Sequence, residues 1–259
     1  AQRRTAGLFG RKTGRGFYAY PEGRQQKPAE APVPEVDLTR LLVWIDPRRP
    51  EARDALAALA ATSGATVETG AHPSPAALIL LAPSGEDATS AAVALGIDAT
   101  RAVAVDTLTP LDRRRTMMTT PVTPAEVRDA AHALLAADGV AVTVVRDSAG
   151  FVAQRILAAI VNVGCDIAQQ RVAAPEDVDR AVELGLGYPK GPLAFGDALG
   201  AARVLTILES MRDLSGDPRY RPSPWLRRRA ALGASLRLDD CRPGGAHAFR
   251  FIRQVRVRR

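Results

Sequence analysis

The stretch from Asp147 to Gly200 decides the fold, and it reads DSAGFVAQRILAAIVNVGCDIAQQRVAAPEDVDRAVELGLGYPKGPLAFGDALG. Apolar residues recur at helical spacing through its first part, and no proline interrupts them. The spacing predicts a buried helix over Gly150–Val172, with an apolar face of Val152, Ile156, Leu157, Ile160, Val161, Val163 and Ile167. Pro175 at a first helical turn, followed by two acids, predicts a second helix that ends at Gly185 and Gly187.

A proline and glycine elbow follows at Tyr188–Pro192, and it should orient the helices on either side of it. Beyond the elbow, Leu199–Leu214 carries another apolar stripe, made of Leu199, Val204, Leu205, Ile207, Leu208 and Met211. Some of this stripe must be buried within its own domain, across a dimer or on another helical domain. The helical pattern continues to Leu236.

Upstream of this stretch, short apolar runs alternate with helical patterns between Leu38 and Val145. Alternation of this kind is typical of strands that cross over through helices to form a parallel sheet. The expected strands are Leu41–Ile45, Thr66–Glu68, Leu78–Leu81, Ala102–Val105 and Ala141–Val145. The expected helices are Glu51–Thr62, Glu86–Leu95 and Pro124–Ala137, the last one capped by Thr123 with Glu126 three residues on. A small α/β domain therefore precedes the all-α one.

The two ends of the chain carry its positive charge. The net charge is +7, of which residues 1–28 hold +6 and residues 237–259 hold +5, so the middle is −4. An acidic body with basic ends argues against a nucleic-acid partner, because phosphate binding needs positive charge clustered on a folded face. Four prolines in residues 21–36 predict an extended linker. The last 23 residues resemble nothing before them, and we expect them to be poorly ordered.

Composition limits the class of protein further. With 259 residues and 46% hydrophobic residues, the chain has room for one large or two ordinary domains. No apolar run is long enough for a membrane span and no signal peptide opens the chain, so we expect a cytoplasmic protein with no membrane partner. Cys165 and Cys241 make neither a disulfide framework nor a metal site, and Cys165 should be a small core residue.

Two separate stretches resemble one known family. GRKTGRGFYAY at Gly10–Tyr20, and GFVAQR with PEDVDRAVELGLGYPKGPLAFGDALG within 150–200, are similar to the C-terminal domain of the 3-hydroxyacyl-CoA dehydrogenases. Longer bacterial members, of the 3-hydroxybutyryl-CoA dehydrogenase type, have a cofactor domain, a helical domain, a reduced Rossmann-like domain and a second helical domain. The resemblance implies that this chain is the back half of such a protein.

The resemblance assigns a place to each segment. Residues 1–20 would end a preceding helical domain, 21–37 would be the linker and 38–146 the reduced Rossmann-like domain. Residues 147–236 would then be the helical 3-hydroxyacyl-CoA dehydrogenase C-terminal domain, followed by the basic tail, 237–259. The missing N-terminal half would be a partner, and the helical domains of the family commonly associate, so a homo-oligomer is expected.

The family's chemistry is hydride transfer between NAD and the 3-hydroxyl carbon of an acyl-CoA, with a His–Glu pair as general acid and base. This chain lacks the glycines that a dinucleotide phosphate needs: Asp46 is followed by Pro47-Arg48-Arg49-Pro50. Glu68, 22 residues beyond Asp46, could meet a ribose hydroxyl or simply be an exposed acid. We therefore expect NAD through the missing N-terminal domain and no cofactor site in this chain.

The catalytic pair is also missing from the sequence. Asp106 stands where the family has its His, and the partner Glu would fall near Met118. We expect a low pKa for the Asp106 carboxyl group, which makes it a poor proton donor at neutral pH. For His72, His132 and His247 no orienting carboxylate is predictable, so a structural role is expected for each. No catalytic or metal-binding residue is predicted.

Two residues remain as candidate substrate contacts. Gln154 occupies the position of the family's assisting Asn, with one methylene more, and the alternative is a helix residue at a domain boundary. Lys190 in the elbow could meet a phosphate of CoA, or it could be a solvated lysine. The family function predicted for the whole protein is NAD-dependent oxidation of 3-hydroxyacyl-CoA to 3-oxoacyl-CoA in fatty-acid metabolism. The alternative is a packing or dimerisation module that supports an active N-terminal half.

Overall fold

The computed structural model describes residues 2–240 and divides the chain after Pro34 into two compact units. The first unit contains α1 (Gln2–Thr5) and a tight loop held by backbone pairs of Arg15 with Gly10 and with Ala19. The second unit begins at Glu35 and contains the sheet and all the larger helices. Cys241, His247 and most of the basic tail lie outside the described residues.

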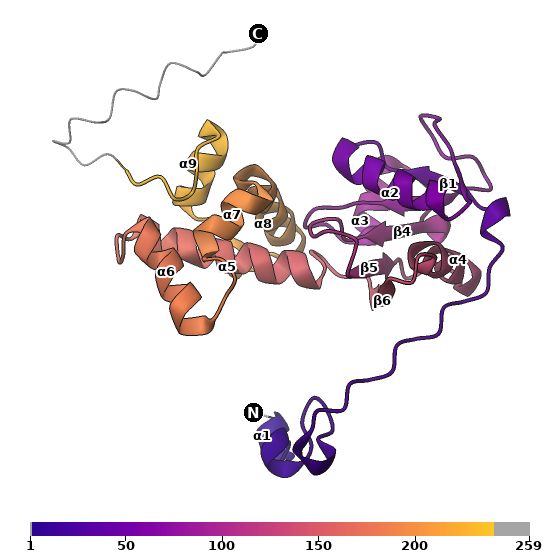
Figure 1. Ribbon diagram of the computed structural model, residues 1–259. Helices are drawn as coiled ribbons and strands as arrows, with labels where there is room; N and C mark the ends of the chain where they lie inside the picture. Colours follow the sequence, from indigo (N-terminus) through magenta and orange to yellow (C-terminus); the bar gives the residue numbers. More distant parts are fainter. Residues whose placement is uncertain (1, 241–259) are drawn as a thin grey trace, which may run out of the picture. The chain divides into compact units, whose positions relative to one another are not determined.

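A six-stranded sheet forms the first half of the second unit (Figure 1). Its strands are β1 (Leu42–Ile45), β2 (Thr66–Val67), β3 (Leu78–Leu81), β4 (Ala102–Val105), β5 (Arg114–Thr119) and β6 (Ala141–Arg146). They are ordered β2-β1-β3-β4-β5-β6, and every neighbouring pair is parallel except β4 and β5. The five expected strands are confirmed to within a residue. The sixth, β5, was not predicted, and it makes the sheet mixed rather than wholly parallel.

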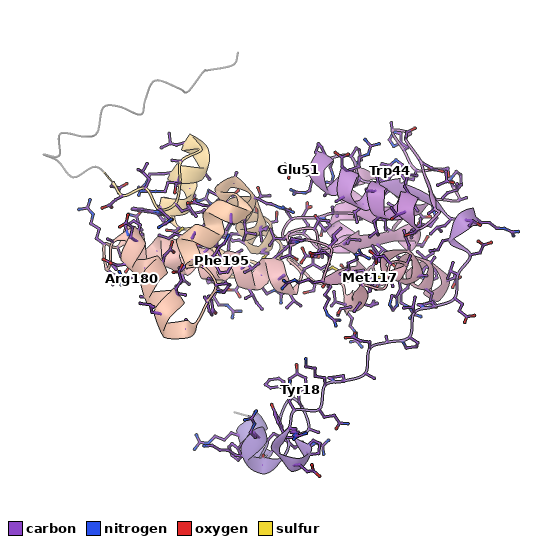
Figure 2. The ribbon with its side chains drawn as sticks, viewed as in Figure 1. Tyr18, Trp44, Glu51, Met117, Arg180 and Phe195 are labelled. Atoms are coloured by element: carbon purple, nitrogen blue, oxygen red, sulfur yellow. The ribbon has the colours of Figure 1, made fainter. Side chains whose placement is uncertain are left out.

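Helices cover both faces of this sheet. α2 (Pro50–Thr62) and α4 (Ala125–Ala136) pack on the face that carries Val43 and Val103, and α3 (Ala88–Leu95) packs on the face that carries Ile79. Trp44 lies in the latter core, and Figure 2 shows it with Met117 in this half of the unit. The alternation of apolar residues along the strands thus fills two cores, as expected of strands that are buried on both sides.

The predicted cap of α4 is wrong. The N-cap residue is Pro124, and the Thr123 hydroxyl does not bond to the helix. Thr123 Oγ1 instead accepts the N–H of Thr120 (2.9 Å) and donates to the carbonyl of Ala102 (3.2 Å). Thr123 therefore closes the turn between β5 and α4, which is a tertiary contact that a capping pattern cannot distinguish from a true cap.

The second half is all-helical, as predicted. It consists of α5 (Val152–Gln169), α6 (Pro175–Leu186), α7 (Pro192–Leu199), α8 (Ala201–Ser215) and α9 (Pro224–Leu232). α6 begins at Pro175 and ends at Gly187 in the left-handed conformation, as the pattern indicated, while Gly185 lies within the helix. Val204, Ile207, Leu208 and Met211 of the α8 stripe are buried in the core of this helical half.

The face of α5 that is buried differs from the predicted one. Val161 is buried, whereas Val152, Ile156 and Val163 are 59%, 53% and 59% exposed. The buried side carries smaller or polar residues, namely Gln154, Ala158, Asn162, Gly164, Cys165 and Ala168. Small residues let α7 approach α5 closely, since a Cβ on Gly164 would lie 2.7 Å from a Pro192 side-chain carbon. The most apolar stripe of α5 is therefore left on the surface of this unit.

The elbow is held by two acids of α6, one turn apart. Asp179 accepts the N–H groups of Leu193 (2.7 Å) and Ala194 (3.1 Å), and so caps α7 from a neighbouring helix. Glu183 accepts the N–H of Gly191 (2.8 Å). Close approach also explains the glycine, because a Cβ on Gly191 would overlap the backbone of Asp179. The expectation that the elbow orients helices is confirmed.

Candidate functional site

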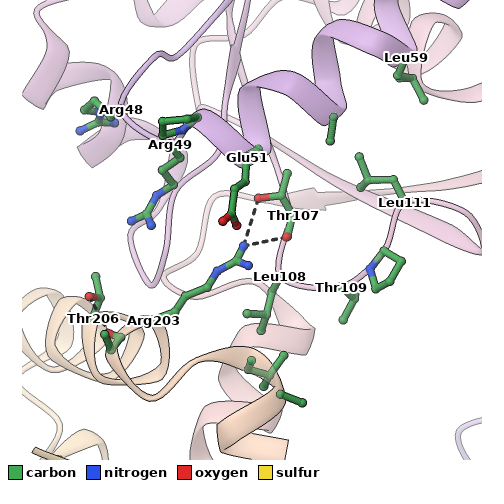
Figure 3. Close-up of a pocket in the computed structure, with 17 residues that line it drawn as sticks. Arg48, Arg49, Glu51, Leu59, Thr107, Leu108, Thr109, Leu111, Arg203 and Thr206 are labelled. Carbon is green, nitrogen blue, oxygen red and sulfur yellow. Dashed lines mark hydrogen bonds between the residues drawn. The ribbon is translucent and has the colours of Figure 1, made fainter. Parts of the chain in front are cut away.

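A cavity of about 920 Å³ lies between the sheet half and the helical half of the second unit (Figure 3). Three segments line it: the start of α2 with the loop before it, the β4–β5 loop and the α7–α8 corner. Their lining residues are Arg48–Ala52, Ala55, Leu59, Thr107–Leu111, Ala198, Leu199, Ala202, Arg203 and Thr206. Since β1 and β4 both end beside it, the cavity occupies the carboxyl edge of the sheet, where open α/β sheets bind their ligands.

The loop between β1 and α2 decides whether a dinucleotide fits this edge. Pro47 and Pro50 have no N–H, and the N–H of Arg48 already donates to Asp46 Oδ1 (2.9 Å). Among these loop residues only Arg49 keeps an uncommitted backbone N–H. A pyrophosphate needs several N–H groups in a row and room for close approach, so the loop does not fit NAD.

The crevice beside this loop is also covered. In the sheet order, the connections reverse between β1 and β3, which is where a dinucleotide would lie. The β3–α3 loop there packs directly on α8: a Cβ on Gly85 would overlap the Ile207 carbonyl oxygen. The helical half thus occupies the space above the switch point, and the cavity opens to one side of it.

Three arginines reach the cavity in different states. Arg48 is paired with the buried Asp46 at 2.8 Å. Arg203 Nη2 donates to the carbonyl (2.7 Å) and to the hydroxyl (3.5 Å) of Thr107, which leaves Nε and Nη1 of Arg203 uncommitted. The side chain of Arg49 has no hydrogen bond or ion pair to any described residue, and burial together with the neighbouring Arg203 lowers its pKa. Two guanidinium groups are therefore available to an anion.

Asp106 lies at the end of β4 but does not line the cavity. It is buried, and its Oδ1 accepts Gln154 Nε2 (3.0 Å) and the N–H of Leu108 (3.0 Å). The low pKa expected for this carboxyl group is wrong, because burial raises it. Met118, near which the resemblance predicts the family's Glu, is a buried residue of β5. The His–Glu pair of the family therefore has no counterpart at these two predicted positions.

Gln154 joins the two halves. Its Nε2 also donates to the carbonyl of Pro83 (3.1 Å), and its Oε1 accepts the N–H of Gly85 (2.8 Å). With both amide hydrogens engaged inside the chain, Gln154 ties α5 to the β3–α3 loop and to Asp106. As a substrate contact it stays a prediction, whereas the boundary role that we set beside it agrees with these bonds.

Phe151 strengthens the same junction. It precedes α5, yet its side chain is buried in the sheet core with Ile79 and Met118. Its φ of +38° is unusual for a residue with a side chain, and such strain persists only where packing enforces it. Insertion of this ring into the opposite core is the packing that enforces it here.

The remaining sequence candidates lie away from the cavity. Lys190 is exposed on the elbow, and as a contact for CoA phosphate it stays a prediction. Glu68 accepts the N–H of Ser74 (2.9 Å), and bonds from Ser74 lower the pKa of Glu68, so it holds a loop. His132 is buried on α4 and His72 is not buried. Cys165 is a buried core residue, as expected, and burial raises its pKa to about 12.

Two kinds of feature are absent from residues 2–240. Within that range, no group of three or more His, Cys, Asp or Glu side chains is placed to hold a metal ion. No helix in the same range has the length and apolar character that crossing a membrane requires.

Comparison with known proteins shows which family this architecture resembles. The class that the fold defines is a Rossmann-like sheet without a glycine phosphate loop, followed by a helical domain of five α-helices. Residues 150–237 match the family described as 3-hydroxyacyl-CoA dehydrogenase, C-terminal domain. The predicted kinship with the 3-hydroxyacyl-CoA dehydrogenase family is therefore confirmed for the helical domain.

Individual relatives agree with this. The chain is 35% identical over 155 residues to a 3-hydroxyadipyl-CoA dehydrogenase of Escherichia coli K12, across 60% of this chain and 32% of that protein. It is 38% identical over 89 residues to a probable 3-hydroxybutyryl-CoA dehydrogenase of Bacillus subtilis, across 34% of this chain and 31% of that protein. The chain therefore spans about a third of the length of these curated relatives.

A solved structure extends the likeness to both halves. The crystal structure of a 3-hydroxybutyryl-CoA dehydrogenase from Escherichia coli K12 matches 89% of this chain and 43% of that chain, with a TM-score of 0.66 and 25% identity. The reduced Rossmann-like sheet followed by the helical domain is thus confirmed as the fold.

The two arginines of the cavity were not predicted as site residues. The sequence drew attention to Arg49 only because it stands in a loop without glycine, and nothing in the sequence indicated that Arg203 lies near it.

Proposed function

We propose that this chain belongs to a protein that oxidises 3-hydroxyacyl-CoA to 3-oxoacyl-CoA with NAD, in fatty-acid metabolism. Three names support the reaction class: the family matched at residues 150–237, and the two curated relatives named above. Within that protein the chain would act as the supporting part and not as the reacting part. NAD and the acyl-CoA would bind to a dehydrogenase half outside these 259 residues.

One observation carries the assignment of a supporting role. At the carboxyl edge of the sheet, the loop in the position of a phosphate loop is Pro47-Arg48-Arg49-Pro50. Its two prolines have no N–H, and the N–H of Arg48 already bonds to Asp46. The carboxyl group in the place of the family's His, that of Asp106, is buried and engaged by Gln154. Neither the cofactor nor a proton acceptor for the substrate hydroxyl has a suitable place here.

The test is turnover by the purified 259-residue chain. We expect no oxidation of NADH in the presence of acetoacetyl-CoA, and no saturable change of NADH fluorescence on titration. A repeat at tenfold higher protein concentration, with a second purification by a different route, excludes a contaminating dehydrogenase. Turnover that scales with the chain in both preparations, together with saturable NADH binding, would overturn the supporting role.

We also propose the second function that the sequence left open, a packing or dimerisation module. The exposed stripe of α5 supports it, since Val152, Ile156 and Val163 lie on one helical face and each is more than half exposed. Leu184 and Leu186 on α6 are exposed as well. Large apolar faces of this kind are characteristic of interaction surfaces. A second copy of the chain, or the first helical domain of a longer protein, is the proposed cover.

A further inference from the structure

The cavity between the two halves has a polar end and an apolar end, and this polarity indicates what it can bind. Arg48 and Arg49 lie at one end, and Leu59 and Leu111 lie at the other (Figure 3). Arg203 and Glu51 face each other between these ends, from α8 and α2. An elongated ligand with one charged end would match this arrangement.

The polar end holds two guanidinium groups that can bind a single negative charge. Arg48 is paired with Asp46, and Glu51 in the lining and Glu86 near Arg49 balance the formal charges of Arg49 and Arg203. Neither Arg49 nor Arg203 has an acid in direct contact with it. Arg49 is half-buried without an ion pair, and it is close enough to Arg203 for the two cations to repel each other. An anion between them would relieve that repulsion and could accept bidentate bonds from either guanidinium.

The apolar end favours a hydrocarbon tail. Its walls are Ala52, Ala55, Leu59, Leu108, Pro110, Leu111, Ala198, Leu199 and Ala202. These residues come from all three lining segments, so a chain lying along the cavity would touch each of them. Its volume, about 920 Å³, is within the range of small-molecule sites.

We propose that this cavity binds an amphipathic carboxylate: an acyl chain of medium length that ends in a free carboxylate group, with the carboxylate between Arg49 and Arg203 and the chain along Leu59 and Leu111. This inference goes beyond the proposed function, since it needs neither NAD nor a thioester. A free inorganic phosphate would leave the apolar walls unused, so we expect the two arginines alone not to hold it. An acyl-CoA would place its charges on the nucleotide, far from its acyl carbons.

The test is calorimetric titration of the full chain with sodium octanoate. We expect saturable binding of one octanoate per chain, and affinity that increases from butanoate to octanoate by about fourfold for each methylene that is buried. Arg49→Ala should weaken octanoate binding at least tenfold, because a charge-assisted bond is lost. Arg203→Ala should do the same, and circular dichroism would show that each variant is folded.

Two further variants separate binding at this site from general attraction of an anion. Arg53→Ala removes a positive charge one turn further along α2, outside the cavity lining, and should leave the affinity within twofold of the original. Ala55→Trp fills the apolar end without changing charge, and should abolish octanoate binding while Arg49 is intact.

Titrations with two other ligands test which kind of anion the cavity binds. Inorganic phosphate should neither bind nor displace octanoate at equal concentration. Octanoyl-CoA should bind no better than octanoate does. The proposal is overturned if octanoate does not bind saturably, if Arg49→Ala and Arg53→Ala have equal effects, or if phosphate or octanoyl-CoA binds in its place. None of these outcomes depends on NADH, so the proposal can fail while the supporting role stands.

Discussion

Asp106 shows how burial changes the chemistry of a carboxyl group. It follows β4, at the position where the sequence resemblance led us to expect the family's imidazole, and its burial raises its pKa. Gln154 Nε2 and the N–H of Leu108 both donate to Oδ1 of Asp106, which compensates its burial only in part. Because the folded state disfavours the ionised form, this carboxyl contributes stability at low pH that is lost as the pH rises through its raised pKa.

We therefore expect Asp106→Asn to stabilise the chain at neutral pH. The amide oxygen can accept the same two bonds, and the desolvated charge is removed. The Tm of the variant should exceed that of the original chain at pH 7 to 8, and the difference should shrink towards pH 4 and below. Thermal melts from pH 3 to 8 measure this.

The control for the Asp106→Asn melts is the same substitution at an exposed aspartate. Asp54→Asn, on the exposed side of α2, should shift the Tm little at any pH. A lower Tm for Asp106→Asn than for the original chain throughout this range would mean that the ionised carboxylate is stabilising where it lies, contrary to the raised pKa.

At the scale of elements, the elbow shows what fixes the helical half. Gly191 is in contact with Asp179, whose carboxylate caps α7, and its own N–H is held by Glu183. A methyl group at Gly191 would meet backbone atoms, which cannot move aside as a flexible side chain can. The junction of α6 and α7 thus depends on one missing side chain and two carboxylates.

We expect Gly191→Ala to lower the free energy of unfolding by about 2 to 3 kcal/mol, the usual cost of overpacking a tight contact. The matched control is Gly185→Ala. Gly185 lies inside α6 with open space around its Cα, so the same methyl should raise stability by about 0.5 to 1 kcal/mol through helix propensity. Urea unfolding of both variants gives the comparison, and equal effects at the two glycines would contradict the close approach.

The elements also show how far the sequence predicts this fold. Periodicity and turn residues sufficed for α6 and for the five strands of ordinary apolar composition. β5 was missed because its pattern, RRTMMT, places an arginine at a buried position. Arg115 is tolerated there because Asp138 and the carbonyl of Leu135 accept its N–H groups (2.6 Å and 2.5 Å), and these partners are 20 or more residues away. Local sequence cannot supply such a partner.

The candidate site could be predicted only in part, because some of its contacts also join residues that are far apart in the sequence. The loss of the glycine loop and of the His–Glu pair could be read from residues in order along the chain. The proximity of Arg49 and Arg203 could not be predicted, since it depends on the packing of α8 on the β3–α3 loop. The direction of the α5 stripe was also misjudged: apolar spacing identifies a face, but the approach of α7 to Gly164 determines which face is buried.

For the molecule as a whole, the exposed face of α5 makes a prediction about assembly. We expect the chain to form dimers at micromolar concentration in sedimentation velocity, with Ile156 and Val163 in the interface. Ile156→Lys combined with Val163→Lys should weaken self-association at least tenfold, because two charges would be buried against apolar surface.

An exposed valine elsewhere tests the specificity of that effect. Val93 on α3 is 70% exposed and lies on the sheet half of the unit. Val93→Lys should leave sedimentation unchanged. If the original chain is a monomer at every concentration, the prediction of a homo-oligomer is wrong. The exposed face of α5 would then be expected to pack against a helical domain of a longer protein.

The junction at Phe151 has a kinetic consequence. A ring from the helical half sits in the sheet core, Gln154 bonds across to Pro83 and Gly85, and the backbone of Gly85 touches Ile207. Hinge closure would have to break these contacts together, so we expect the two halves to move as one body, with no lid over the cavity mouth among residues 35–240 of this unit. Ligand entry would then be ungated, and binding should follow one exponential whose rate rises linearly with ligand concentration, without the plateau that a conformational step imposes.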